Sequence, residues 1–259
     1  IVSLFNDEVV PFSMFNLEAA KTSFGHRFLS KGETSLGKAF TVSLKASILD
    51  QYRKMSVILD QQERRDMIVS GLKNYSQINL DEDLLNEIVY LVEMPTLLKG
   101  DFDEKYLELP DFVLIECMKK HQRYFPYYTK SKLQASFLVV ADNVTKFNQK
   151  KIVSGNENVL IARLEDAMFF YKNDINQDLN EFVKKLSGVV FQKNAGTMLD
   201  KQSRIFSILQ FLNDAKVFDI DDSVLKKIAT LSKMDLVSSM VLEFPSLQGK
   251  MGAVYARLA

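Results

Sequence analysis

The segment from Met118 to Lys132 combines two kinds of side chain that nucleic-acid-binding proteins use. Five cations are interleaved with four aromatic rings: Lys119, Lys120, Arg123, Lys130, Lys132, Tyr124, Phe125, Tyr127 and Tyr128. Cations neutralise phosphates and aromatic rings stack on unpaired bases, which together suit single-stranded regions and ends of RNA. The alternative is a strand with its rings in the core and its cations in water, because strand side chains alternate between two faces. The residue types alone leave both open.

Charge is segregated along a chain whose formal net charge is zero. Residues 81–116 carry eleven acids against only Lys99 and Lys105, whereas residues 117–141 contain five cations and no acid. A zero net charge argues against a general binder of polyanions. A basic segment of this kind can still meet phosphates locally.

Two cations outside this segment are further candidates. Lys193 lies in a second run without acids, residues 182–199. Arg163 lies on a predicted helix, where the alternative role is a surface ion pair that involves Glu165 or Asp166. Both are weaker candidates than the segment at Met118 to Lys132, because fewer cations and rings surround them.

Other kinds of chemistry have little support. The chain has two histidines, His26 and His121, and one cysteine, Cys117. No nucleophile-elbow pattern stands beside either histidine, one cysteine excludes an internal disulfide, and the three leave almost no capacity for a transition metal. No phosphate-binding glycine loop occurs. We therefore expect no catalytic residue, no metal and no cofactor in this chain, and we interpret Cys117 as a small buried hydrophobe.

The composition is that of a globular protein, with 47% apolar and 25% charged residues. No apolar run approaches the roughly 20 residues of a membrane span, and no signal-peptide pattern opens the sequence. We therefore expect a cytoplasmic protein. The sequence starts in mid-pattern with IVSLFNDEVVPF and stops with MGAVYARLA without a cap, so we expect an internal fragment of a longer protein.

The first two thirds of the chain predict a mixture of helices and strands. Runs rich in β-branched and aromatic residues predict strands at residues 40–44, 56–59, 112–118 and 133–142. Asp60 with Glu63 predicts a capped helix over residues 61–73. The run 81–93 places apolar residues on one helical stripe and acids in its first turn, where the helix dipole favours them. The cationic segment therefore lies between two predicted strands.

Ser154 with Glu157 predicts another capped helix, which runs to about Lys172. Its predicted buried face holds four residues: Leu160, Leu164, Ala167 and Tyr171. We place a domain boundary near residue 181, because the pattern beyond it predicts helices only.

The last quarter of the chain predicts two long helices. Thr197 with Asp200 caps the first, and the second runs over about residues 222–242, before Pro245. We therefore predict an α+β fold with a mixed domain at residues 1–181 and an all-helical segment at residues 182–259.

Six sequence blocks are similar to one protein family. They are KTSFGHRFLS (21–30), LVEMPTLLKGDFDEKYLELP (91–110), MKKHQRYFP (118–126), GNENVLIARLEDAMFFYKND (155–174), KLSGVVFQKNAGTMLDKQSRI (185–205) and KMDLVSSMVLEFPSLQGKMGAVYAR (233–257). In this order they resemble the beta subunit of the bacterial glycyl-tRNA synthetase. The resemblance covers nearly the whole chain, and six linked blocks argue strongly against chance.

The resemblance implies an α2β2 heterotetramer in which the alpha subunit uses ATP to make glycyl-adenylate in a class II site. It also implies that residues 1–181 correspond to a B3/B4-like α+β domain and residues 182–259 to the truncated start of a helical HD-like domain. Many family members continue Tyr-Ala-Arg with His-Asp-Gly, whereas Leu258 and Ala259 follow Arg257 here. An HD phosphohydrolase needs such metal ligands. We therefore expect an HD-like architecture without a metal.

The resemblance implies that this chain takes part in tRNA binding, and we place that binding on the cationic segment. We expect RNA contacts from Lys119, Lys120, His121, Gln122, Arg123 and Tyr124, with Arg163 and Lys193 behind them. These residues would hold the acceptor region so that the terminal adenosine reaches the alpha subunit's site, an effect of proximity. One alternative is a structural or assembly module that contacts the alpha subunit without RNA. The other is an editing-like deacylase, for which the need is small because a glycine site excludes larger amino acids by size.

Overall fold

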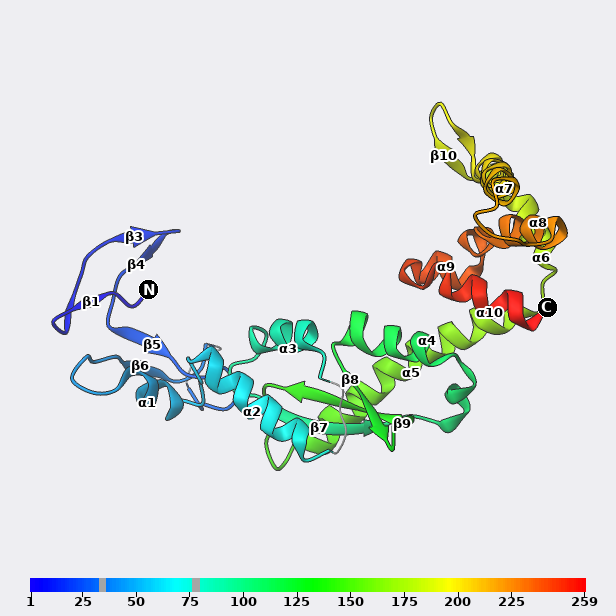
Figure 1. The fold of residues 1–259 in the computed structure, drawn as a ribbon. Coiled ribbons are helices and arrows are strands. Elements are labelled where there is room, and N and C mark those ends of the chain that lie inside the picture. Colours follow the sequence, from blue (N-terminus) through cyan, green and yellow to red (C-terminus); the bar gives the residue numbers. More distant parts are fainter. Residues whose placement is uncertain (33–35, 76–79) are drawn as a thin grey trace. The chain divides into compact units, whose positions relative to one another are not determined.

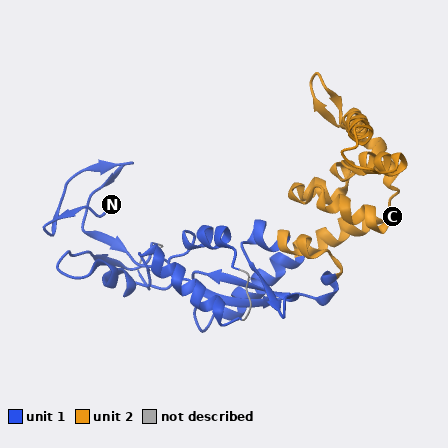
Figure 2. Ribbon diagram, viewed as in Figure 1, with its two compact units in different colours: residues 1–107, 117–161 blue, residues 108–116, 162–259 orange. Residues whose placement is uncertain are grey.

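The structure is a computed structural model that describes residues 1–32, 36–75 and 80–259. It contains two compact units (Figure 2): unit 1 is made of residues 1–107 and 117–161, and unit 2 of residues 108–116 and 162–259. The predicted mixture of helices and strands is confirmed, and the strands of each sheet pair antiparallel. The division into domains at 1–181 and 182–259 stays a prediction, because compactness alone does not show which stretch folds independently.

Unit 1 is built around a three-stranded antiparallel sheet (Figure 1). The central strand is β9, Lys132–Ala141, and it pairs with β7, Thr96–Asp101, and with β8, Phe125–Thr129. The strand predicted over residues 133–142 is therefore confirmed. Its register places Leu138 opposite Phe125, so both side chains lie on the same face of the sheet.

Two helices pack on that face. α2, Gln61–Lys73, is capped by Asp60, and α3, Glu82–Val89, is capped by Asp81, each carboxylate accepting a backbone N–H in the first turn. One apolar cluster joins the helices to the sheet: Ile68, Leu72, Leu84, Leu85, Ile88, Val89, Val92, Phe125 and Leu138. Burial of one such side chain contributes roughly 1.5–3 kcal/mol. The predicted helix over 61–73 is confirmed, and the one predicted over 81–93 ends earlier.

The other face of the sheet buries Phe137, which is fully inaccessible. Gly100 lies directly opposite in β7, and a Cβ atom there would collide with the Phe137 ring. The ring of Tyr124 stacks on Phe137, with centroids 4.5 Å apart. α5, Gln149–Ile175, begins beside them: the Tyr124 hydroxyl donates to Asn156 Oδ1 at 2.6 Å. The chain just before β8 is thereby attached to α5.

The capped start predicted for α5 is wrong. The helix begins at Gln149, so Ser154 and Glu157 lie inside it. Glu157 accepts a hydrogen bond from the backbone N–H of Asp101 instead, at 3.0 Å. The predicted buried face is largely confirmed, because Leu160, Leu164 and Ala167 are inaccessible and Tyr171 is half-buried.

The described residues among 1–32 and 36–60 form small hairpins and one short helix. The elements are β1 Leu4–Phe5, β2 Glu8–Val9, β3 Ser13–Met14, β4 Leu17–Glu18, β5 Thr22–Phe24, β6 Ala39–Thr41 and α1 Ile48–Arg53. None of the residues 1–20, all of which the structure describes, is buried. The strand predicted at 40–44 is found in part as β6. The strand predicted at 56–59 is wrong, because Val57 to Leu59 are outside any strand, although the Ile58 N–H bonds the Glu93 carbonyl.

The strand predicted at residues 112–118 is also wrong. The chain forms the short turn η1, Glu104–Glu108, then α4, Asp111–Glu116, and then one turn of π-helix, η2, Cys117–His121. A short apolar run does not distinguish a buried strand from a buried helix. Cys117 is fully buried, which confirms its interpretation as a hydrophobe.

Unit 2 is mostly helical. Its further elements are α6 Leu179–Lys185, η3 Leu186–Gly188, β10 Val190–Gln192, β11 Gly196–Thr197, α7 Met198–Asp214, α8 Asp222–Leu231, η4 Met234–Val237, α9 Ser239–Glu243, η5 Pro245–Leu247 and α10 Lys250–Leu258. The prediction of helices only beyond residue 182 is wrong at β10 and β11, which form a hairpin. The capping box of Thr197 and Asp200 is confirmed at the start of α7.

The single helix predicted over residues 222–242 is in fact broken into three elements. α8 stops at Leu231, and the Ser238 side chain accepts from the Val241 N–H to start α9. A serine that caps a new helix competes with continuation of the old one. No helix among the described residues is long and apolar enough to span a bilayer.

Candidate functional site

The predicted RNA-binding segment is shaped by a helix end that reverses into β8. The N–H of Arg123 bonds the Lys119 carbonyl at 3.0 Å, and the N–H of Tyr124 bonds the Met118 carbonyl at 2.9 Å. Arg123 itself has a positive φ of 57°. Met118 is fully buried and anchors the turn, so the cations around it lie at the surface of unit 1.

Two of these cations are neutralised by acids near α3. Lys119 Nζ lies 2.8 Å from a carboxylate oxygen of Asp81, and Arg123 Nε lies 2.5 Å from one of Glu87. The acidic segment therefore folds against the basic one. These two ion pairs hold the turn against α3, and a carboxylate neutralises each of the two cations.

Tyr124 does not present its ring to a base in this structure. It is 2% exposed, its ring stacks on Phe137, and its hydroxyl bonds Asn156. Burial raises the pKa of Tyr124 to about 12, so the hydroxyl stays a donor. Lys120 and His121 lie at exposed positions and Gln122 is half-buried.

The two remaining candidates lie in unit 2. Arg163, on α5, forms a 3.4 Å ion pair with Glu243 of α9, rather than one with Glu165 or Asp166. Lys193 is exposed in the turn between β10 and β11. The eight predicted residues thus form one continuous group of six in unit 1 and two separate positions in unit 2.

The Lys119–Asp81 pair makes a testable contribution to stability. The hydrogen bond from Lys119, and then that from the Leu84 N–H, lower the pKa of Asp81 from 3.8. Because the folded-state pKa is the lower one, the contribution is complete above the unfolded-state pKa and is lost as the pH falls through the folded-state value. A partly exposed pair contributes at most about 1 kcal/mol.

Lys119→Met should therefore lower the free energy of unfolding at pH 7 by about 1 kcal/mol or less. It should also reduce the loss of stability between pH 6 and pH 3, measured by urea unfolding. Lys150→Met, at an exposed position of α5, is the matched control and should change neither quantity. Equal pH dependence in the wild type and Lys119→Met would show that the pair contributes nothing.

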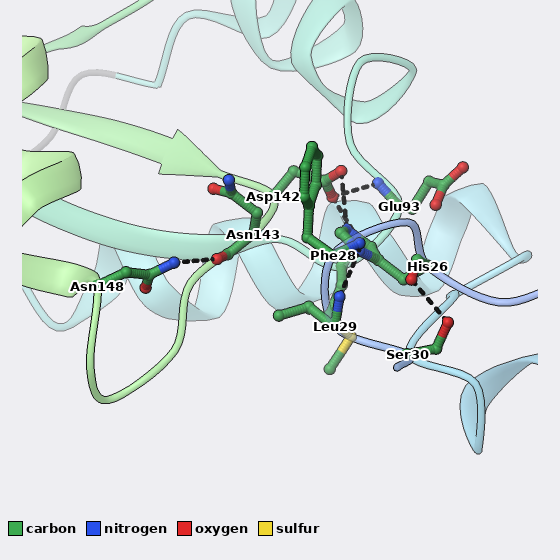
Figure 3. Close-up of polar contacts among 9 residues, drawn as sticks. His26, Phe28, Leu29, Ser30, Glu93, Asp142, Asn143 and Asn148 are labelled. Atoms are coloured by element: carbon green, nitrogen blue, oxygen red, sulfur yellow. Dashed lines mark hydrogen bonds and ion pairs between the residues drawn. The ribbon is translucent and has the colours of Figure 1, made fainter. Parts of the chain in front are cut away.

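A second polar cluster surrounds His26, which sequence patterns did not single out (Figure 3). His26 is 1% exposed and its Nε2 lies 3.0 Å from Asp142 Oδ2. Its Nδ1 accepts two backbone hydrogen bonds at 3.1 Å, from Phe28 and Leu29. Asp142 Oδ1 accepts from the backbone N–H groups that follow α3, at Glu93 and Met94. The cluster therefore ties residues 26–30 to the end of β9.

The backbone fixes the tautomer of His26. Since Nδ1 faces two N–H donors, it cannot carry a proton, and the proton of the neutral ring must be on Nε2, where it is donated to Asp142. Gly25 precedes this histidine because a Cβ atom would collide with Ser30 and Met55. The block KTSFGHRFLS is thus explained by packing and hydrogen bonding around one imidazole.

Among the described residues, His26, Glu93 and Asp142 are the one group with the composition and spacing of metal ligands. The hydrogen bonds do not fit such a site. A neutral imidazole that binds a metal through Nε2 carries its proton on Nδ1 and donates it to an acceptor. Here Nδ1 is itself the acceptor. The arrangement is that of a buried structural histidine.

Unit 2 holds two buried carboxylates with a comparable role. Asp174 accepts from the N–H groups of Ser239 and Met240, both at 2.9 Å, and from the Tyr255 hydroxyl at 2.8 Å. Asp235 accepts from the N–H groups of Gly249 and Gly252 at the start of α10. These bonds explain much of the block KMDLVSSMVLEFPSLQGKMGAVYAR.

Across the part of the chain that the structure describes, no buried side-chain nitrogen or oxygen lacks a hydrogen-bond partner. Buried polar groups with satisfied partners stabilise a fold, whereas reactive groups need access to a substrate. The candidate function therefore rests on the surface of the two units.

The chain is similar to known proteins of one family. The model of the glycyl-tRNA synthetase beta subunit family matches residues 1–259. The chain is 40% identical to the glycine–tRNA ligase beta subunit of Bacillus subtilis, 38% to that of Listeria welshimeri and 42% to that of Lactobacillus helveticus, in each case over its full length. It spans 37–38% of the length of these relatives.

The relatives are components of aminoacyl-tRNA synthetases, which are ligases. The chain belongs to the glycyl-tRNA synthetase beta subunit family. The resemblance drawn from the six sequence blocks is confirmed.

Proposed function

We propose that this chain is the part of a glycyl-tRNA synthetase that binds and positions tRNA, while an alpha subunit carries the aminoacylation site and uses ATP. The observation that supports this most is the family match over all 259 residues. The alpha subunit and the tRNA for glycine are then the partners, and the assembly is an α2β2 heterotetramer in the cytoplasm. In this proposal the chain supplies binding and geometry, which lower the entropic cost of the reaction.

The two structural descriptions drawn from the family remain part of the proposal. We propose that residues 1–181 form a B3/B4-like domain and that residues 182–259 begin an HD-like domain without a metal or cofactor. The combination of an antiparallel sheet and helices in unit 1 and the high helix content of unit 2 support this.

The RNA contacts that we propose come from the exposed members of the predicted set. Lys120, His121 and Gln122 provide them in unit 1. Lys119, Arg123 and Tyr124 support that surface through their contacts with Asp81, Glu87 and Phe137. Arg163 and Lys193 provide contacts from unit 2.

In the complete synthetase, Lys120→Glu should raise the KM for tRNA several-fold and leave glycine-dependent ATP–pyrophosphate exchange unchanged, because this chain acts on tRNA and not on the adenylate. Its tRNA affinity should also depend less steeply on salt, by about one unit in the slope of log K against log salt.

Lys150→Glu is the control, because it reverses the charge of one exposed lysine on α5. It should keep the wild-type KM for tRNA and the wild-type salt dependence. An unchanged KM in Lys120→Glu would remove the unit 1 surface from the proposal. Activation of glycine by this chain without an alpha subunit would contradict the proposed function as a whole.

An assembly role is the second candidate, and a specific observation favours it. Residues 1–20 expose large apolar side chains, with Phe5 at 69% and Phe15 at 86%. Contiguous exposed apolar surface marks protein contacts. Sedimentation of the complete synthetase with Phe5→Ser and Phe15→Ser distinguishes this role, because subunits would dissociate while tRNA affinity per intact enzyme stayed the same.

The editing-like alternative has less support. It requires a reactive group at a substrate, whereas His26, Asp174 and Asp235 are occupied by internal hydrogen bonds. Hydrolysis of mischarged glycine tRNA by the complete synthetase would be the observation in its favour.

A further inference from the structure

The hairpin of β10 and β11, together with the first turns of α7, forms a surface of cations around one aromatic ring. Lys201 Nζ lies 3.9 Å from the centroid of the Phe191 ring, and the guanidinium of Arg204 lies 5.8 Å from it. Phe191 is 40% exposed and its neighbour Val190 is 71% exposed. Figure 1 shows the hairpin at β10, and Lys193 follows β10 in the exposed turn.

Cations outnumber acids on this surface, although Arg204 interacts electrostatically with Asp200. Residues 190–204 contain three cations and one acid, Asp200. Asp200 is committed to the capping box: its Oδ2 accepts from the N–H of Thr197 at 2.7 Å and from its hydroxyl at 2.9 Å. Within the described ranges, none of the three cations forms an ion pair with a carboxylate. Lys119 and Arg123 in unit 1 differ, since each is paired.

The hairpin is held in a fixed position on α7. The N–H of Met198 bonds the Val189 carbonyl at 2.7 Å, and the N–H of Ala195 bonds the Gln192 carbonyl at 2.9 Å. Gly196 has a φ of +74°, and a Cβ atom there would collide with the Asp200 carboxylate. A surface that is already ordered loses little conformational entropy when it binds a ligand.

We propose that this surface binds unpaired nucleotides of the tRNA, with Phe191 stacking on a base and Lys193, Lys201 and Arg204 neutralising phosphates. This inference rests on the proposed function, because it assigns part of the proposed tRNA binding to the hairpin surface. Cations around an aromatic ring are the combination that binds single-stranded nucleic acid. The apolar side chains of Val190 and Phe191 favour an unpaired region, because the bases of a duplex are already stacked on one another.

Two single substitutions in the complete synthetase test the two kinds of contact. Lys193→Gln should reduce the slope of log K for tRNA against log salt by about 0.7, the value of one contact with a single-stranded phosphate. Phe191→Leu keeps an apolar side chain but removes the stacking surface, and it should weaken tRNA binding at least about fivefold. Both are measured by fluorescence anisotropy with labelled glycine tRNA.

A short single-stranded RNA and a blunt RNA duplex are the comparison probes, and Lys150→Gln is the control variant. Phe191→Leu should weaken binding of the single strand and not that of the duplex. Equal losses for both probes would overturn the assignment of stacking. Wild-type affinity and salt slope in both variants would overturn the whole inference.

The test separates this inference from the proposed function. If Lys120→Glu weakens tRNA binding and the hairpin variants do not, the proposed function stands and this surface is not part of it. If a variant with glutamine in place of Lys193, Lys201 and Arg204 keeps its tRNA affinity but loses its subunit association, the inference is wrong and the surface binds an acidic protein segment instead. If the beta subunit does not bind tRNA at all, both the proposed function and this inference are wrong.

Discussion

Replacing His26 by leucine is expected to lower the free energy of unfolding of unit 1 by about 2–4 kcal/mol. The substitution leaves the N–H groups of Phe28 and Leu29 without their acceptor and removes the bond to Asp142. A buried donor or acceptor that loses its partner costs about 1–3 kcal/mol, less where water can reach it. The apolar volume is nearly kept, so loss of packing is a minor part of the effect.

His26→Asn separates the two sides of the ring. The asparagine oxygen can accept from the N–H groups two and three residues later, as in an Asx turn, but the side chain is too short to replace the bond to Asp142. It should therefore lose about half as much stability as His26→Leu. Urea unfolding gives the free energy, and hydrogen exchange of the Phe28 and Leu29 amides reports on this site locally. Equal stability of the leucine variant and the wild type would show that the cluster does not hold unit 1 together.

The parts of this fold that the sequence predicts well are those determined within a few residues. Asp60 bonds an N–H two residues later, and Thr197 exchanges hydrogen bonds with Asp200 three residues later. Both helix starts were predicted. Ser154 and Glu157 have the same spacing but lie inside α5, which begins at Gln149, directly after reciprocal hydrogen bonds between Thr145 and Asn148.

The misassigned segments are those where tertiary contacts decide. The run 112–118 is apolar except for Glu116, and such a short run is equally compatible with a strand and with the helix that it forms. The break between α8 and α9 lies where Ser238 caps a new helix, and the nearby Asp235 carboxylate accepts from the N–H groups of Gly249 and Gly252, which are distant in sequence. Periodicity does not contain that information.

In the candidate site too, the sequence shows the local features but not the tertiary contacts. The cations of the segment 118–132 are visible in the sequence, but their acidic partners are not: Asp81 is 38 residues from Lys119, and Glu87 is 36 residues from Arg123. The sequence also does not show that Tyr124 is buried. It does show the absence of acids in residues 182–199. In the structure, Lys193 of this run shares the surface of the β10–β11 hairpin and α7 with Lys201 and Arg204, whereas Lys184 of the same run pairs with Glu181.

Replacing Asp174 by alanine is expected to have the largest effect of any single substitution considered, a loss of about 3–5 kcal/mol in the stability of unit 2. The carboxylate is 0% exposed and accepts three hydrogen bonds. Its removal leaves Ser239 and Met240 at the start of α9, and Tyr255 of α10, without an acceptor. Burial, and then the charge of Asp174, raise the pKa of Tyr255, so this hydroxyl keeps its proton and remains a donor at neutral pH.

Three further variants show whether the effect comes from these bonds. Tyr255→Phe removes one bond and should cost about 1–1.5 kcal/mol. Asp174→Asn keeps the side-chain volume, but its NH2 group replaces an acceptor and faces a donor. Its loss of stability should therefore lie between those of Tyr255→Phe and Asp174→Ala. Asp178→Ala removes an aspartate that caps α6 at an exposed position, and it should cost only about 1 kcal/mol. If Asp174→Ala and Asp178→Ala destabilise the unit equally in denaturant unfolding, with no selective loss of hydrogen-exchange protection at Ser239 and Met240, then Asp174 acts as an ordinary helix cap and does not join α5 to α9 and α10.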